Sequence, residues 1–229
     1  MHKIYFHHFH KCAGTSMVRY LESNYSLFGP HANGNILDDH NIAFPIHLYD
    51  SSRLDEFLER VGSDSFCYEW GIPDMQRIRA KGFYTVTVIR EPTERLLSNY
   101  KFDIQSGNVC MPFLEYVSNI AVPFWSGNYY TSEISSSMLR SGIERINSTS
   151  MVDFILNQFD EIWLMEKGEF ILIKGAGHLA DGFKVQHNKS KKRFSLFRSI
   201  KTPSNVSDYC RDDLEFYELV KASLKRIGD

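Results

Sequence analysis

Residues 7–16, with the sequence HHFHKCAGTS, carry the residue types of an anion-binding turn. They follow a short apolar run and precede a helix-like stretch, so the turn would lie at a strand-to-helix junction. Such a junction offers free backbone N–H groups, and Lys11, Thr15 and Ser16 add a cation and two hydroxyls. The segment therefore predicts a site for one tetrahedral anion. The alternative is a tight turn before a helix that Thr15 or Ser16 caps.

A second turn of this kind begins at Arg90, directly after the β-branched run FYTVTVI of residues 83–89. Pro92 would open the following helix, because proline is favoured at a first helical position. Ser98 comes eight residues after Arg90, about two helical turns along, so both side chains could hold one phosphate. Taken alone, Arg90 is better explained as a helix-capping or salt-bridging residue than as a phosphate ligand.

The rest of the chain supplies elements that would place both turns at one edge of a sheet. Strands and helices alternate, which predicts an α/β domain with a mainly parallel central sheet between helical layers, spanning residues 1–229 as one domain. Residues 29–50 are rich in Gly, Pro, Asn, Asp and His and predict an irregular excursion. The expected strands are 3–9, 66–68, 83–89 and 161–165, and the expected helices are 15–24, 50–61, 73–80, 92–100, 112–119, 133–140, 150–158 and 207–227.

Composition narrows the classes of protein. The formal charge of −2 argues against a general nucleic-acid binder, and no apolar run approaches the roughly 20 residues of a membrane span. Four scattered cysteines without a CxxC pair suggest reduced thiols, and no secretory signal is visible, so we expect a cytoplasmic protein. His7 and His8 would point to opposite faces of a strand, so we expect no metal site.

The two turns together resemble the cofactor signatures of sulfotransferases that use 3′-phosphoadenosine 5′-phosphosulfate (PAPS). The 5′-phosphosulfate loop of that family, H-x-P-K-x-A-G-T-S, is matched at Lys11 and at residues 13–16, with His10 where proline is usual. The 3′-phosphate motif, R-x-P-x-x-R-x-x-S-x-Y, is matched at Arg90, Pro92, Arg95, Ser98 and Tyr100. The carbohydrate-type branch, related to heparan and chondroitin modifying enzymes, is the most similar.

This resemblance implies a P-loop-like fold and the in-line transfer of a sulfuryl group from PAPS to a hydroxyl or amine, without a metal ion. The favoured acceptor is a carbohydrate. The product left from the donor would be 3′-phosphoadenosine 5′-phosphate (PAP). Lys11 would neutralise the bridging oxygen, and Glu69 would be the base, with His47 and His40 as backups. The residues expected to bind the cofactor are His10, Lys11, Cys12, Ala13, Gly14, Thr15, Ser16, Arg90, Ser98, Asn188 and Ser190.

Weaker similarities extend along the chain, at residues 128–131, 159–166 and 188–190. Ser132 stands where the family usually has an arginine on the acceptor side. Aromatic side chains near that segment could stack on a sugar, although such clusters often belong to a core. The expected acceptor contacts are Trp70, Trp125, Tyr129 and Tyr130.

Two other functions remain open at this stage. A P-loop kinase or NTPase also wraps a strand-to-helix turn around phosphates, but its lysine follows the last glycine of the loop, whereas Lys11 precedes Gly14. An inactive nucleotide- or glycan-binding module would keep Arg90 and Ser98 without needing Lys11. The sequence does not name the acceptor or the oligomeric state.

Overall fold

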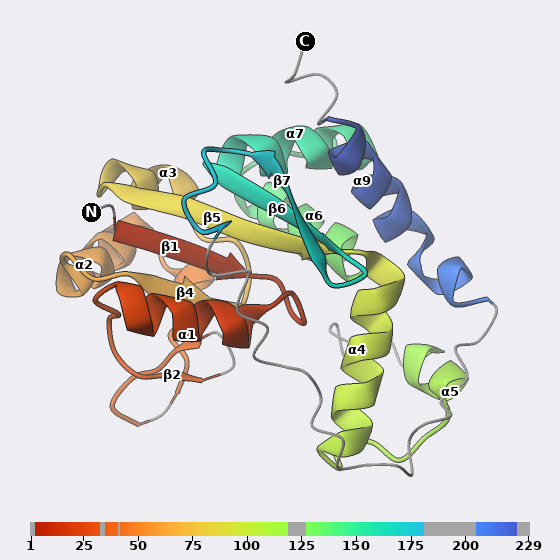
Figure 1. Cartoon of the computed structure of the whole chain (residues 1–229). Helices are drawn as coiled ribbons and strands as arrows, with labels where there is room; N and C mark the ends of the chain where they lie inside the picture. Colours follow the sequence, from red (N-terminus) through yellow and green to blue (C-terminus); the bar gives the residue numbers. More distant parts are fainter. Residues whose placement is uncertain (1–2, 33–34, 41, 119–126, 181–204, 224–229) are drawn as a thin grey trace.

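The computed structural model describes residues 3–32, 35–40, 42–118, 127–180 and 205–223, and a five-stranded sheet forms their centre (Figure 1). The strand order is β4-β1-β5-β6-β7, in which the first four strands are parallel and β7 is antiparallel to β6. The strands are β1 (Lys3–His8), β4 (Phe66–Tyr68), β5 (Phe83–Arg90), β6 (Glu161–Glu166) and β7 (Glu169–Lys174). The predicted α/β architecture with a mainly parallel sheet is confirmed.

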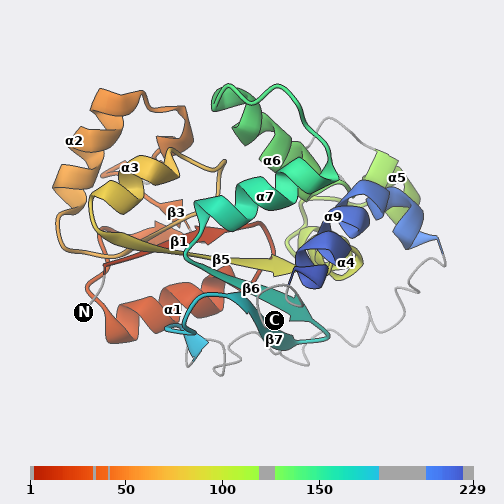
Figure 2. The same ribbon diagram turned by 90° about the horizontal axis from the view of Figure 1, so that it is seen from above.

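Helices cover both faces of this sheet, which gives the predicted layers (Figure 2). Helix α1 (Gly14–Asn24) lies on one face, and α2 (Ser51–Val61), α3 (Met75–Ala80), α6 (Tyr129–Arg140) and α7 (Ser148–Gln158) lie on the other. A further group lies beyond the carboxyl end of β5 (Figure 1). It consists of α4 (Pro92–Gln105), α5 (Phe113–Ser118), η4 (Val206–Cys210) and α9 (Arg211–Ala222).

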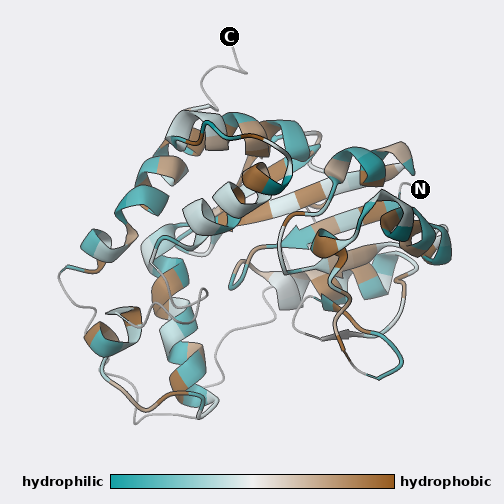
Figure 3. Cartoon of the chain, turned by 180° about the vertical axis from the view of Figure 1, so that it is seen from behind, coloured by the Kyte–Doolittle hydropathy of each residue, from teal (hydrophilic) through white to brown (hydrophobic). Residues whose placement is uncertain are grey.

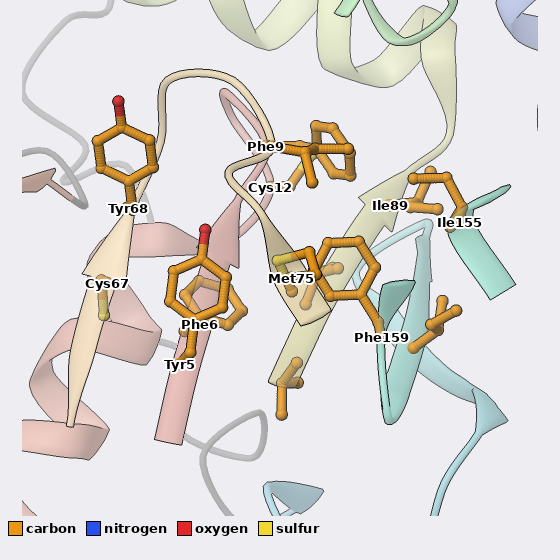
Figure 4. Packing of buried hydrophobic residues seen from close by; sticks show 14 of the residues in the cluster. Tyr5, Phe6, Phe9, Cys12, Cys67, Tyr68, Met75, Ile89, Ile155 and Phe159 are labelled. Carbon is orange, nitrogen blue, oxygen red and sulfur yellow. The ribbon is translucent and has the colours of Figure 1, made fainter. Parts of the chain in front are cut away.

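The main core forms on both faces of the strands, because a parallel sheet covered on two sides buries nearly every residue. Figure 4 shows Tyr5 and Phe6 on β1, Cys67 on β4 and Ile89 on β5 in this core, and Figure 3 shows apolar stretches along the same strands. A second cluster of buried side chains joins α4, α5 and η4 around Leu96 and Tyr116. All four cysteines are free. Within the described residues, no helix has the length and apolar character needed to cross a bilayer.

Two helices begin at other residues than the sequence predicts, because a side chain that accepts from their first N–H groups sets the start. Helix α3 begins at Met75 rather than Pro73, because the Asp74 side chain accepts a hydrogen bond from the backbone N–H of Arg77. Helix α6 begins at Tyr129 rather than at residue 133. Its first N–H groups donate to the carboxylate of Asp213, on α9, a partner that no local pattern reveals.

Three further expectations are corrected. The antiparallel edge strand β7 was not predicted, since a strongly charged hairpin separates it from β6. Residues 29–50 hold the short pair β2 (His31–Ala32) and β3 (Asn35–Ile36) and a turn of 3-10 helix at Ile46–Leu48. The last helix is divided, because the 3-10 turn η4 precedes α9, and residues 224–227 lie outside the described part of the chain.

Candidate active site

The turn between β1 and α1 has the backbone of an anion-binding loop. Lys11 and Ala13 both have left-handed conformations, with φ angles of 65° and 63°. In the described part of the chain, we find no protein acceptor for the backbone N–H groups of Lys11, Ala13, Gly14 and Thr15. Successive N–H groups left open in such a turn, at the start of an eleven-residue helix, form a concave donor site suited to an anion.

Gly14 allows this turn to pack against the strand before it. A Cβ atom at Gly14 would lie 2.2 Å from the His8 ring, a distance that no side chain tolerates. The predicted capping of α1 by Thr15 or Ser16 is wrong, because Ala13 is the N-cap and makes no side-chain cap bond. Thr15 is exposed and Ser16 is half-buried, and both residues belong to the first turn of α1.

The Lys11 side chain rests on α4. Its Nζ lies 3.8 Å from the centroid of the Phe102 ring, one helical turn beyond Ser98. Burial lowers the pKa of Lys11 from its ordinary value, while the charges of Glu69 and Asp103 oppose that shift.

The second turn lies beside the first. Arg90 ends β5, and its Nη1 is 3.5 Å from the backbone oxygen of Lys11, while its Nε is 3.4 Å from Glu94. Pro92 begins α4 as predicted, and the Glu91 side chain caps it by accepting from the N–H groups of Thr93 and Glu94. Arg90 is half-buried, as is Ser98 two turns along α4. The structure therefore brings the two predicted turns together.

Tyr129 and Tyr130 were expected to contact an acceptor, and the structure places them elsewhere. They are 1% and 0% exposed, and the guanidinium of the fully buried Arg95 lies 4.6 Å and 5.8 Å from their ring centroids. The Tyr129 hydroxyl accepts from the backbone N–H of His10 at 3.2 Å. The expected acceptor contact is therefore corrected: both rings are buried against the two turns and offer no exposed face on which a sugar could stack.

Glu69 lies directly after β4, at the same edge of the sheet. It is 5% exposed, and its Oε1 is 2.8 Å from His10 Nδ1 and 3.3 Å from His8 Nδ1. Its Oε2 accepts from Asn35 Nδ2 at 3.1 Å. Burial alone would raise the pKa of Glu69, but the electrostatic interactions with His8, His10 and Lys11 and the hydrogen bond with His10 outweigh it and lower that pKa.

The two backup bases lie in different settings. His47 Nδ1 is 2.5 Å from the Tyr68 hydroxyl, and its ring packs against Gly71, two residues after Glu69. Burial, with a contribution from Arg140, lowers the pKa of His47 to about 4. His40 lies in an exposed turn, where its backbone N–H donates to Asp38.

The remaining predicted residues divide into two groups. Trp70, next to Glu69, is 39% exposed and is the predicted acceptor contact that offers an accessible aromatic surface. Trp125, Asn188 and Ser190 lie outside the described residues. Among the described residues, no group of three or more His, Cys, Asp or Glu side chains could hold a metal ion.

Sequence reasoning missed the side chains that connect these parts. Asn35 holds Glu69 through two hydrogen bonds, Asn99 contacts His10, and Phe102 lies under Lys11. Asn99 and Phe102 belong to the helix after the second turn, at positions adjoining the Ser98 of the motif. A search for polar or aromatic residues on that helix face would have found them, whereas nothing local identifies Asn35.

Comparison with known proteins adds the family. Residues 1–223 match the model of a family described as the Sulfotransferase family, so the chain belongs to that family. Sulfuryl transfer is accordingly its general chemistry. No curated protein gave a significant match to the chain.

Proposed function

We propose that the chain is a PAPS-dependent sulfotransferase with a P-loop-like nucleotide site, which transfers the sulfuryl group to a hydroxyl, or an amine, of a carbohydrate acceptor. The observation that carries the proposal is the 3.5 Å approach of Arg90 Nη1 to the backbone oxygen of Lys11. This contact brings the two turns together at a single edge of the sheet, which supports their binding one nucleotide. Open sheets bind ligands at this edge.

The residues present fit a bis-phosphorylated nucleotide. The open N–H groups of residues 11 and 13–15 and the hydroxyls of Thr15 and Ser16 suit the 5′-phosphosulfate end. Arg90 and Ser98 suit the 3′-phosphate, since a guanidinium can donate two parallel hydrogen bonds to phosphate oxygens. Asn188 and Ser190 are proposed to complete the site on the basis of the family resemblance.

The donor supplies an activated sulfuryl group, and the chain supplies position and charge. In the proposed reaction an acceptor oxygen forms a bond to sulfur while the bond from sulfur to the bridging oxygen breaks, and PAP leaves. Lys11 donates to the bridging oxygen as negative charge accumulates there. Preorganised N–H donors in the loop stabilise the same charge without reorganising during the reaction.

Glu69 is the proposed base for the acceptor proton. Its lowered pKa keeps it ionised at neutral pH, which is the form a base requires. A carboxylate has about four lone-pair sites, and the hydrogen bonds with His10 and Asn35 use two of them. Trp70, next along the chain, is proposed to stack on the acceptor.

Calorimetric titration tests the nucleotide site. We expect PAP to bind in EDTA, with micromolar affinity or better, and to be preferred over Mg-ATP. Preference for Mg-ATP would indicate a kinase or NTPase, and binding of neither nucleotide would refute the proposal. Lys11→Ala should lower turnover by about 100- to 1,000-fold. Arg90→Ala should weaken PAP binding by about 10- to 100-fold.

Matched controls separate these effects from general loss of charge. Lys101, exposed on α4, and Arg77, which pairs with Asp55 between α3 and α2, are the control positions for Lys11 and Arg90. Lys101→Ala and Arg77→Ala should leave PAP affinity and turnover unchanged. An active PAP-binding protein that sulfates lipid or small-molecule acceptors but no sugar would overturn only the carbohydrate assignment.

A further inference from the structure

The side chain of Arg90 contacts a carboxylate that is itself anchored. Glu94, in the first turn of α4, uses each of its two oxygens for a different partner. Its Oε2 lies 3.4 Å from Arg90 Nε, and its Oε1 accepts from the backbone N–H of Lys167 at 3.0 Å. The Glu94 carboxylate therefore joins the strand end that carries Arg90 to the turn between β6 and β7.

The turn that supplies the Lys167 N–H has a defined backbone. Glu166 and Glu169 pair across it, so the loop consists of Lys167 and Gly168. Both residues have left-handed conformations, with φ angles of 52° and 83°. Two-residue loops with positive φ at both positions are favoured in hairpins, because their twist matches the twist of the flanking strands. The hairpin backbone therefore fixes the donor that holds Glu94.

A backbone hydrogen bond ties the same hairpin to the start of α4 without Glu94. The N–H of Glu91 donates to the backbone oxygen of Met165 at 2.9 Å, two residues before the turn begins. The Glu91 side chain also caps α4. The helix start and the hairpin are thus held in a fixed relation, and the backbone of both elements places the Glu94 carboxylate.

This arrangement leaves most donors of Arg90 for a ligand. A guanidinium has five N–H donors in a planar fork. In the described part of the chain, the donor on Nε faces Glu94, and Nη1 lies 3.5 Å from the backbone oxygen of Lys11. The other three N–H donors belong to Nη1 and Nη2, which can form two parallel hydrogen bonds to phosphate oxygens.

We propose that Glu94, anchored by the turn between β6 and β7, is a positioning residue for nucleotide recognition, which holds Arg90 in the conformation that binds the 3′-phosphate. A free arginine side chain would lose rotamer freedom when a phosphate binds, and a side chain that is ordered in advance avoids this cost. The role in recognition rests on the proposed function, whereas the anchored contact with Arg90 does not.

The negative charge of Glu94 by itself opposes phosphate binding, because like charges repel. A Glu94 that acted only through its charge would therefore weaken recognition of the 3′-phosphate, whereas a positioning Glu94 strengthens it. Other carboxylates share this neighbourhood. Burial raises the pKa of Tyr217, and four acidic side chains near it add to that shift: Glu166, Glu91, Glu218 and Glu94. The two roles of Glu94 thus predict effects of opposite sign.

Calorimetric titration with two nucleotides measures which role holds. PAP carries the 3′-phosphate and adenosine 5′-phosphate (AMP) lacks it, so the ratio of their affinities reports the 3′-phosphate contact. Glu94→Gln keeps the size of the side chain and should lower this ratio by about 2- to 10-fold. A ratio that rises would show that Glu94 acts through charge, and an unchanged ratio would show a structural role alone. Either result would overturn the proposal.

Glu218→Gln is the matched control for Glu94→Gln. It removes an exposed carboxylate from the same acidic neighbourhood and should leave the ratio unchanged. The variant Glu94→Asp separates charge from position, because it keeps the carboxylate but withdraws it from Arg90 by one methylene. It should also lower the ratio, and it provides the test if Glu94→Gln does not fold.

A double-mutant cycle tests whether Glu94 acts through Arg90. In the Arg90→Ala background, Glu94→Gln should no longer lower the ratio of PAP to AMP affinity, because the side chain that Glu94 positions is missing. An undiminished effect of Glu94→Gln in that background would refute the proposed route.

Nuclear magnetic resonance separates this proposal from the proposed function. With nitrogen-15 in the arginine side chains and no nucleotide present, the Nε–H signal of Arg90 is identified by its loss in Arg90→Lys. We expect this signal to shift in Glu94→Gln and to stay in place in Glu218→Gln. An unmoved signal in Glu94→Gln would refute the anchored contact even if PAP binds. A shifted signal in a chain that binds neither PAP nor AMP would refute the proposed function and the role in recognition, but not the contact.

Discussion

The hydroxyl oxygen of Tyr130 lies 3.0 Å from the sulfur of Cys12. The same hydroxyl is 2.9 Å from both the backbone nitrogen and the backbone oxygen of Arg90. A single buried group on α6 therefore joins the two turns that follow β1 and β5. The distance between the two turns is set by a third element, in addition to the pairing of their strands.

Removing this hydroxyl should weaken both turns at once. Tyr130→Phe leaves the backbone N–H of Arg90 and the Cys12 thiol without their buried partner, and an unsatisfied buried donor costs about 1–3 kcal/mol. We expect the free energy of unfolding in urea to fall by that amount and PAP affinity to fall with it.

Tyr84→Phe is the matched control for this variant. The Tyr84 hydroxyl donates to Glu161 Oε2 at 3.2 Å, near the start of β5 and β6 and away from the two turns. Its loss should lower stability without changing PAP affinity. Equal loss of affinity in both variants would mean that Tyr130 acts only through global stability.

Gly14→Ala tests the close packing of the first turn against β1. Alanine usually stabilises a helical position relative to glycine by up to about 1 kcal/mol. Here the added Cβ would lie 2.2 Å from the His8 ring, which would have to move, and His8 in turn contacts Glu69. We expect a net loss of stability in urea unfolding and a loss of PAP binding.

Gly142→Ala provides the comparison for Gly14→Ala. Gly142 has a φ of 76°, and no atom lies within 4 Å of the position that a Cβ atom would take there, so its substitution costs only backbone strain. PAP binding should survive this change. A Gly14→Ala protein that is as stable as the wild type and binds PAP normally would contradict the packing argument.

The sequence predicted the parts of the site that depend on local order. Lys11, Gly14 and Arg90 follow apolar strands, and neighbouring parallel strands end at one edge, so their proximity follows from topology. Whether a segment forms a strand or a helix also follows from local order, because it depends on the spacing of apolar residues along the chain. Pairing of β1 with β5 brings the two turns to the same edge of the sheet, and Tyr130 then joins them.

The sequence could not predict the supports that come from distant elements. Asp213 caps α6 across more than 80 positions, and Asn35 orients Glu69 from a short strand pair in an irregular segment. Tyr129 and Tyr130 were misjudged because aromatic residues serve equally in cores and in sugar sites. Burial, which depends on packing of α6 against α9, decided between these uses.

Phe102→Leu tests the resting position of Lys11. The ammonium group lies 3.8 Å from the Phe102 ring centroid, a contact worth about 0.5–2 kcal/mol. Binding of a phosphosulfate at the turn would draw the ammonium toward the anion and weaken this contact. We therefore expect Phe102→Leu to bind PAP a few-fold more tightly in calorimetric titration.

Leu114→Ala, at an exposed apolar position on α5, is the control for Phe102→Leu and should not change PAP affinity. Weaker binding by Phe102→Leu would show that Phe102 holds Lys11 in its working position and that the ammonium does not move on binding.

Asp213 should make stability depend on pH. Burial raises the pKa of Asp213 to about 6 from its ordinary value of 3.8, although Arg95 and the N–H groups of Thr131 and Tyr130 oppose the shift. The folded chain thus holds this proton more tightly than the unfolded chain does. Its contribution to stability is fully present below pH 3.8 and is lost as the pH rises through about 6.

Asp213→Asn should remove that dependence, because the amide does not titrate. A pKa difference of roughly two units corresponds to about 3 kcal/mol, so the free energy of unfolding of the wild type should fall relative to the variant by an amount of that order between pH 4 and pH 7. The stability of the variant should also be lower at every pH, since the carboxylate accepts from two N–H groups and the amide oxygen of asparagine replaces only one of its two oxygens.

His47 also makes stability depend on pH, because burial lowers its pKa to about 4, and its effect has the opposite sign. This effect is the same in both proteins and cancels in the comparison. Guanidinium unfolding at several pH values measures the difference, and parallel curves for the two proteins would show that Asp213 titrates normally in the folded chain.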